Sequence, residues 1–135
     1  MTVANLDLAV QAHQAGLWPE AEALYRSFLG VHPDEPVAGY NLGILLLGQA
    51  RLEGLSWVQQ ALLAGGGRLD LAAASASAVQ ALQAHQYKDH ANQFVQWLEL
   101  HGLQALGHEA LRGKAALPWI FAAFGAHGFA PLSPH

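Results

Sequence analysis

The sequence predicts an all-α fold in which about three helical hairpins stack on one another and are followed by C-terminal capping helices. Apolar residues between Pro19 and Leu29 recur at helical spacing, and a short corner separates this stretch from another helical run. The first unit then recurs in altered form about 34 residues further along the chain. Such repetition is typical of arrays in which each unit packs mainly against its neighbours.

The first hairpin is predicted to occupy about the first 31 residues. Its first helix covers Ala4–Ala15, Gly16 forms the corner, and Pro19 lies in the first turn of the second helix. A proline suits that position because its missing N–H would have no helical partner there. Gly30 ends the second helix.

A second hairpin is predicted from helices over Val37–Gly48 and Gly54–Leu63. Asp34 precedes them and is expected to cap the first helix. Gly43 lies inside that helix, where a glycine costs about 1 kcal/mol relative to alanine. We therefore expect the partner helix to approach closely at Gly43.

A third hairpin is predicted from helices over Leu71–Ala84 and Lys88–His101, with Asp70 as a cap. A first capping helix is expected over Leu103–Gly113. We assign residues 1–113 to the repeat domain and residues 114–135 to an apolar C-terminal helix with a frayed end.

The repeating unit resembles the tetratricopeptide repeat. In the first unit, Ala21, Tyr25 and Pro33 stand at second-helix positions of that pattern, and in the second unit Asn41-Leu42-Gly43 matches its first helix. The likeness extends over about residues 4–101 and weakens toward the third unit. It implies a short α-solenoid in which the first helix of each hairpin lines a concave groove.

The resemblance also implies which residues face that groove. We call them the groove residues: Leu6, Val10, His13, Tyr40, Ile44, Leu47, Val79 and Leu82. None is Lys or Arg, so we expect an apolar or amphipathic protein segment as the ligand, bound as a helix in a groove. The alternative is that these residues form the core or are covered by the chain's own C-terminal segment.

The C-terminal segment carries a dense apolar run. Leaving it in water would cost about 25 cal/mol per Å² of apolar surface, so we expect it to pack on the domain or on a partner. The contact residues expected in this tail are Trp119, Ile120, Phe121 and Phe124.

Composition excludes several classes of protein. The net charge is −4 with six Lys and Arg, which argues against a nucleic-acid partner. The chain has no Cys, and therefore no disulfide or thiolate metal site. No apolar run reaches the ~20 residues that a membrane span needs. The N-terminus lacks the pattern of a signal peptide, and we expect a cytoplasmic protein.

Chemistry-bearing motifs are also missing from the sequence. His85 and His90 flank a corner but are five residues apart, whereas zinc ligands on a helix are usually three or four apart. The Gly65–Gly67 run lacks the Lys-Ser/Thr of a phosphate-binding loop. We therefore expect no catalytic residues, no metal and no cofactor, and the chain is not expected to be an enzyme.

The function expected is that of a scaffold or adaptor, which binds a protein partner through the groove or the tail. One alternative comes from the AEALYR and HPDEP segments, which are similar to repeat regions preceding catalytic domains in bacterial glycosyltransferases. That similarity implies an accessory domain serving such an enzyme. A second alternative is a homo-oligomer whose groove accepts the neighbour's tail, which the charged share of only 12% also fits.

Overall fold

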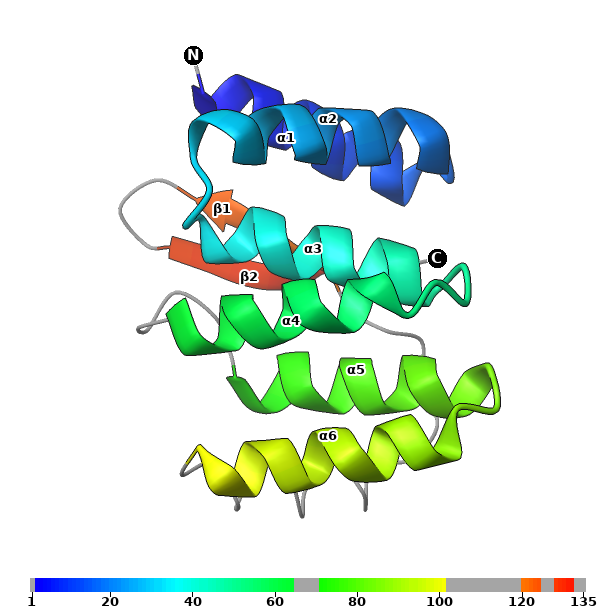
Figure 1. The fold of residues 1–135 in the computed structure, drawn as a ribbon. Helices are drawn as coiled ribbons and strands as arrows, with labels where there is room; N and C mark the ends of the chain where they lie inside the picture. Colours follow the sequence, from blue (N-terminus) through cyan, green and yellow to red (C-terminus); the bar gives the residue numbers. More distant parts are fainter. Residues whose placement is uncertain (1, 65–70, 102–119, 125–127, 133–135) are drawn as a thin grey trace.

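A computed structural model describes residues 2–64, 71–101, 120–124 and 128–132 of the chain. Within these residues, six helices stack as antiparallel pairs and a two-stranded sheet lies beside them (Figure 1). The elements are α1 (Thr2–Gln14), α2 (Trp18–Val31), α3 (Pro36–Leu47), α4 (Glu53–Ala64), α5 (Leu71–Ala84), α6 (Lys88–Leu100), β1 (Ile120–Phe124) and β2 (Gly128–Leu132).

The six helices confirm the predicted helical class, and each lies within about two residues of its expected bounds. Helices α1 and α2, α3 and α4, and α5 and α6 form the three predicted hairpins. The predicted cap Asp70 and the capping helix over Leu103–Gly113 lie outside the described residues.

The helix expected through Phe124 is a wrong prediction, because Ile120–Phe124 forms strand β1. It pairs antiparallel with β2, and Ile120 lies opposite Leu132. The physical reason is visible in the sequence. Two short apolar runs, IFAAF and GFAPL, are separated by a glycine-containing stretch, a pattern that a β-hairpin fits as well as a helix does.

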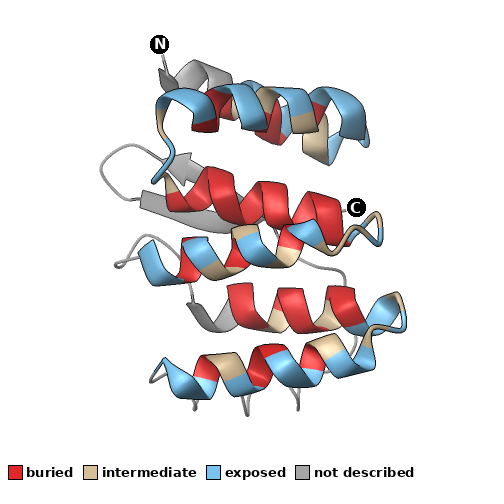
Figure 2. Ribbon diagram, in the orientation of Figure 1, coloured by how far each residue is buried: buried red, intermediate tan, exposed pale blue. Residues whose placement is uncertain are grey.

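Helix α3 is the centre of the fold, and all of its residues are buried (Figure 2). It packs against α4, α2, α5 and β1. A helix that is apolar on every side needs such a position. Residues from the other helices complete the core, with Tyr25, Phe94 and Leu98 among its largest buried side chains.

Helix α3 begins at Pro36, and Glu35 rather than the predicted Asp34 is its cap. One carboxylate oxygen of Glu35 accepts a hydrogen bond from the Val37 N–H at 3.1 Å. Because Pro36 is already the first helical residue, the residue directly before it occupies the capping position.

All three hairpins turn through the same corner. Gly16, Ala50 and Gln86 follow the first helix of each pair, and each has a positive φ, of 79°, 61° and 67° respectively. In each corner the next residue donates its N–H to a carbonyl five residues earlier, as in Leu17 to Ala12 at 2.9 Å. This is the Schellman motif, repeated in each unit.

The close approach expected at Gly43 is confirmed. A Cβ built at position 43 would lie 2.7 Å from both the Gly54 carbonyl oxygen and the Val58 Cγ2. Gly54 faces it on α4, where an added Cβ would be closer still to the Gly43 carbonyl. The two backbones therefore touch where both helices carry glycine.

We predict that Gly43→Ala destabilises the fold by about 1–3 kcal/mol, because α3 and α4 must separate to admit the methyl group. Gly39→Ala in the same helix is the control, since its Cβ would meet nothing closer than Ala61 Cβ at 3.8 Å. That variant should gain up to about 1 kcal/mol from helix propensity. Urea unfolding measures both, and equal effects would contradict the packing argument.

Candidate functional site

The groove residues do not form an open surface in the structure. Strand β1 lies against α1 and α3, the helices that carry most of them. Buried groove residues are Leu6, Val10, Tyr40, Ile44, Leu47, Val79 and Leu82, while His13 is partly buried. Of the expected tail contacts, Ile120, Phe121 and Phe124 belong to β1, and Trp119 lies outside the described residues.

His13 ends a hydrogen-bonded chain that crosses three helices. Its Nδ1 lies 3.0 Å from the Tyr25 hydroxyl, and the two rings meet edge to face. The Tyr25 hydroxyl is also hydrogen-bonded to the side chain of Asn41 in α3. A similar contact joins Tyr40 to Ser77 in α5. These contacts tie the hairpins to one another inside the core.

Burial keeps this chain of groups neutral. It lowers the pKa of His13 from 6.5 to about 4, and it raises the pKa of Tyr25 and of Tyr40 well above the usual tyrosine range. At neutral pH the imidazole and both phenols are therefore uncharged. An uncharged, packed network of this kind specifies how the helices fit together rather than holding an ion.

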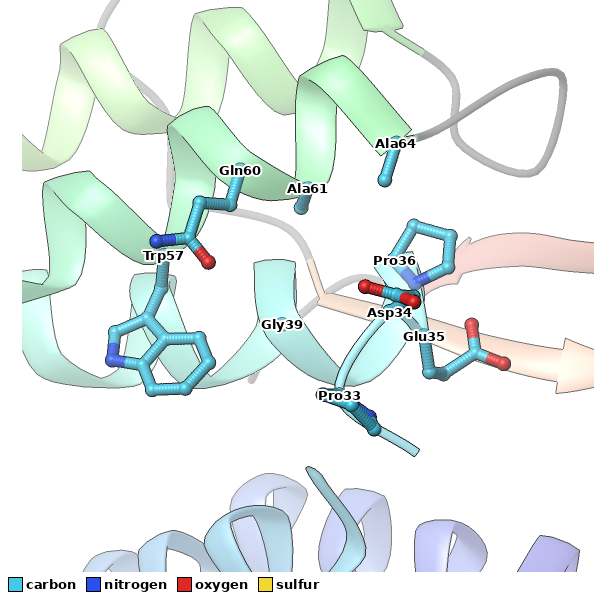
Figure 3. Close-up of a pocket in the computed structure, with 9 residues that line it drawn as sticks. All are labelled: Pro33, Asp34, Glu35, Pro36, Gly39, Trp57, Gln60, Ala61 and Ala64. Carbon is cyan, nitrogen blue, oxygen red and sulfur yellow. The ribbon is translucent and has the colours of Figure 1, made fainter. Parts of the chain in front are cut away.

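A small cavity opens at one edge of the stack, between the start of α3 and the outer side of α4 (Figure 3). We call it the edge cavity, and its volume is about 50 Å³. Pro36 and Gly39 line it from α3, while Trp57 and Gln60 line it from α4. Figure 3 shows the Trp57 ring on one side of the space and the Asp34 carboxylate on another.

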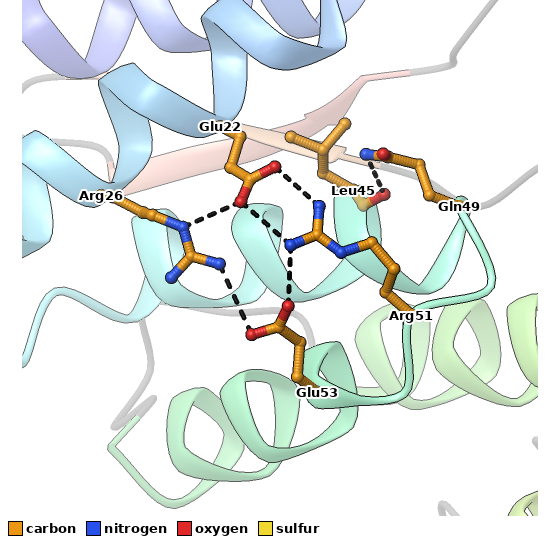
Figure 4. A network of polar contacts seen from close by, with 6 residues as sticks. All are labelled: Glu22, Arg26, Leu45, Gln49, Arg51 and Glu53. Atoms are coloured by element: carbon orange, nitrogen blue, oxygen red, sulfur yellow. Dashed lines mark hydrogen bonds and ion pairs between the residues drawn. The ribbon is translucent and has the colours of Figure 1, made fainter.

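Four charged side chains form a cluster on the opposite part of the stack, between the first two hairpins (Figure 4). Arg51 donates to Glu22 at 2.8 Å and to Glu53 at 2.8 Å, and Arg26 donates to Glu22 at 2.9 Å. The hydrogen bond from Arg51 is the main reason that the pKa of Glu22 is lowered. The charges balance one another, so this cluster joins α2 to α4 and offers no spare charge to a ligand.

Two histidines, one in the third corner and one at the end of α6, act as hydrogen-bonding groups. His85 Nε2 lies 3.0 Å from the Gly48 carbonyl oxygen, and His101 Nδ1 lies 2.9 Å from that of Trp97. Beside His85, the Tyr87 hydroxyl donates to the Ala50 carbonyl at 3.1 Å. The third corner is thus bonded to the second. Among residues 2–64, 71–101 and the two strands, no three His, Asp or Glu side chains gather as metal ligands would.

None of the helices in the described part of the chain combines the length and apolar character needed to cross a membrane. In comparisons with known proteins, no protein-family model, curated protein or solved structure matches the sequence. The likeness to the tetratricopeptide repeat therefore stays a prediction from the sequence.

Sequence reasoning did not find the edge cavity. Its residues come from the segment before α3 and from α4, and no motif links the two. The only signal was Gly39, a second glycine within α3, whose lack of a side chain leaves the space open.

We predict that Glu22→Gln lowers the Tm by up to about 3 °C, since it weakens contacts to both arginines that remain partly exposed to water. The control is Glu20→Gln, a change to an exposed residue of the same helix. Calorimetry in low salt should separate the two variants. The difference should shrink in about 1 M NaCl, where charges are screened beyond ~3 Å, and a salt-independent difference would contradict an electrostatic origin.

We further predict a pH-dependent contribution from His13. Its folded pKa of about 4 lies below the ordinary 6.5, so the fold favours the neutral ring. This contribution is complete above pH 6.5 and is lost as the pH falls toward 4, at about 1.4 kcal/mol per pH unit. Urea unfolding of the wild type and of His13→Gln across this range measures it. Parallel stability curves for the two proteins would contradict the prediction.

Proposed function

We propose that this chain is a non-catalytic protein-interaction module of the tetratricopeptide type, whose groove holds an extended protein segment. The observation that supports the proposal is the position of β1 against α1 and α3. In the structure, the segment seated there is the chain's own C-terminal hairpin. A partner segment of similar composition would take the same place.

The chemistry of the groove residues favours an apolar ligand. They include no Lys or Arg, and His13 is held neutral by burial. A charged ligand would lose its hydration there without gaining an opposite charge. The IFAAF sequence of β1 has no charged residue and so matches this surface.

The mode of binding differs from the helix in a groove that the sequence led us to expect. The segment against α1 and α3 is a strand, paired with β2 along one edge. Specificity on this proposal comes from the apolar side chains of an extended segment together with the pairing of its backbone to a second strand.

Because the chain's own hairpin occupies the groove, it limits the binding of external partners. An external partner must compete with a hairpin that is covalently attached, and the attached segment has the advantage of a high effective concentration. A partner therefore binds more tightly once the hairpin is removed.

To test this, a chain stopped at Gly113 is mixed with a synthetic peptide of residues 114–135 and binding is followed by calorimetry. We expect saturable binding with a Kd in about the micromolar range. The matched control is the same peptide with Phe121→Asp and Phe124→Asp, which should bind more than about tenfold more weakly because two apolar side chains are replaced by charged ones.

Two results would contradict the proposal. The first is a truncated chain that is folded by circular dichroism but does not bind the peptide. The second is a truncated chain that does not fold, since the hairpin would then be a fixed part of the core. Light scattering on the full chain adds a further check, because a dimer that becomes a monomer on truncation would show that the hairpin seats on a second copy.

A further inference from the structure

We propose that the edge cavity is a second interaction site, which receives an arginine side chain from a partner protein. The site is separate from the surface under β1, since it is built from the segment before α3 and from α4. Three features indicate a long cationic side chain as the ligand: the size of the cavity, its apolar base and its one available carboxylate.

The size of the cavity selects a single side chain rather than a whole element. A volume of about 50 Å³ is too small for a helix or a strand but accommodates the end of one side chain. The base of the cavity is apolar, because Pro36, Gly39 and Ala61 present no polar side-chain atom there. The methylene stem of a long side chain can bury against such a base while its charged end stays at the rim.

The rim supplies an unneutralised negative charge. Asp34 is exposed, and within the described part of the chain its carboxylate has no hydrogen bond or ion pair. The neighbouring Glu35 uses a carboxylate oxygen to cap α3. Arg26 and Arg51, the two arginines in the described part of the chain, are held by Glu22 and Glu53. Within the described part of the chain, no cation is paired with Asp34, so a cationic ligand would find this charge available.

The aromatic wall explains why arginine fits better than lysine. Trp57 is partly exposed, and Figure 3 shows its ring bordering the space that the Asp34 carboxylate borders from another side. A planar guanidinium can stack on an indole face, which an ammonium group does less well, and it can also donate to a carboxylate. The Gln60 amide at the rim offers an oxygen acceptor to the remaining N–H groups.

Exposed apolar side chains near the cavity indicate which other residues the partner segment should carry. Val31 is 69% exposed and lines an adjoining hollow that also includes Asp34. Leu63 is 59% exposed and precedes Ala64, which borders the edge cavity. The partner segment is therefore expected to place aliphatic residues next to its arginine.

The test uses the full chain and NMR titration with N-acetyl-arginine amide at low salt. We expect saturable shifts of the Trp57 indole N–H and the Gly39 amide, with a Kd in about the millimolar range. N-acetyl-norleucine amide has a similar stem without the charge and should cause no saturable shift. Equal shifts with both compounds, or no shift with either, would overturn the proposal.

Two variants make the result specific to the site. Asp34→Asn should raise the Kd about two- to fivefold, whereas Asp89→Asn, an exposed aspartate at the start of α6, should leave it unchanged. Gly39→Ala keeps the charge but places a methyl group 4.0 Å from the Trp57 ring, and it should abolish the shift of the indole N–H. If the two aspartate variants bind alike, or Gly39→Ala binds as the wild type does, the arginine does not occupy this cavity.

Discussion

The fold depends on the contact between the backbones of α3 and α4. Helix α3 is buried along its whole length, so every neighbour must fit against it, and α4 does so most closely through Gly43 and Gly54. This close contact determines how the two helices of the second hairpin pack against each other. The first and third hairpins then pack on either side of it, through α2 and α5. The first and third hairpins therefore both take their positions from their contacts with the second hairpin.

Polar groups reinforce this arrangement in two different environments. In the core, Tyr25 and Tyr40 form neutral contacts with groups on neighbouring helices, and burial makes any unpaired partner costly. At the surface, Arg51 in the second corner reaches Glu22, while His85 and Tyr87 in the third corner reach carbonyls of the second. The second and third corners are thus each bonded to the hairpin before them, in addition to the contacts of the apolar core.

The sequence predicted the parts of the fold that depend on local patterns. Helical periodicity located all six helices, and the energetic cost of Gly43 correctly indicated a close contact. The positive φ at Ala50 and Gln86 could not be foreseen, because neither is the glycine that this conformation favours. The strand at Ile120–Phe124 was missed because a short apolar run fits a helix or a strand equally well. The edge cavity depends on tertiary packing between two helices, and its one local signal, Gly39, does not reveal what that glycine faces.

The position of β1 also bears on how the chain is made. The strand lies against α1, although about a hundred residues separate the two in the sequence. A ribosome completes α1 and α3 long before it reaches β1, so on a growing chain their apolar face has no cover from the hairpin. Contacts between such distant segments also form slowly. During synthesis this apolar face therefore stays uncovered by the hairpin until the C-terminal segment has been made, and exposed apolar surface of this kind makes an incomplete chain prone to aggregation.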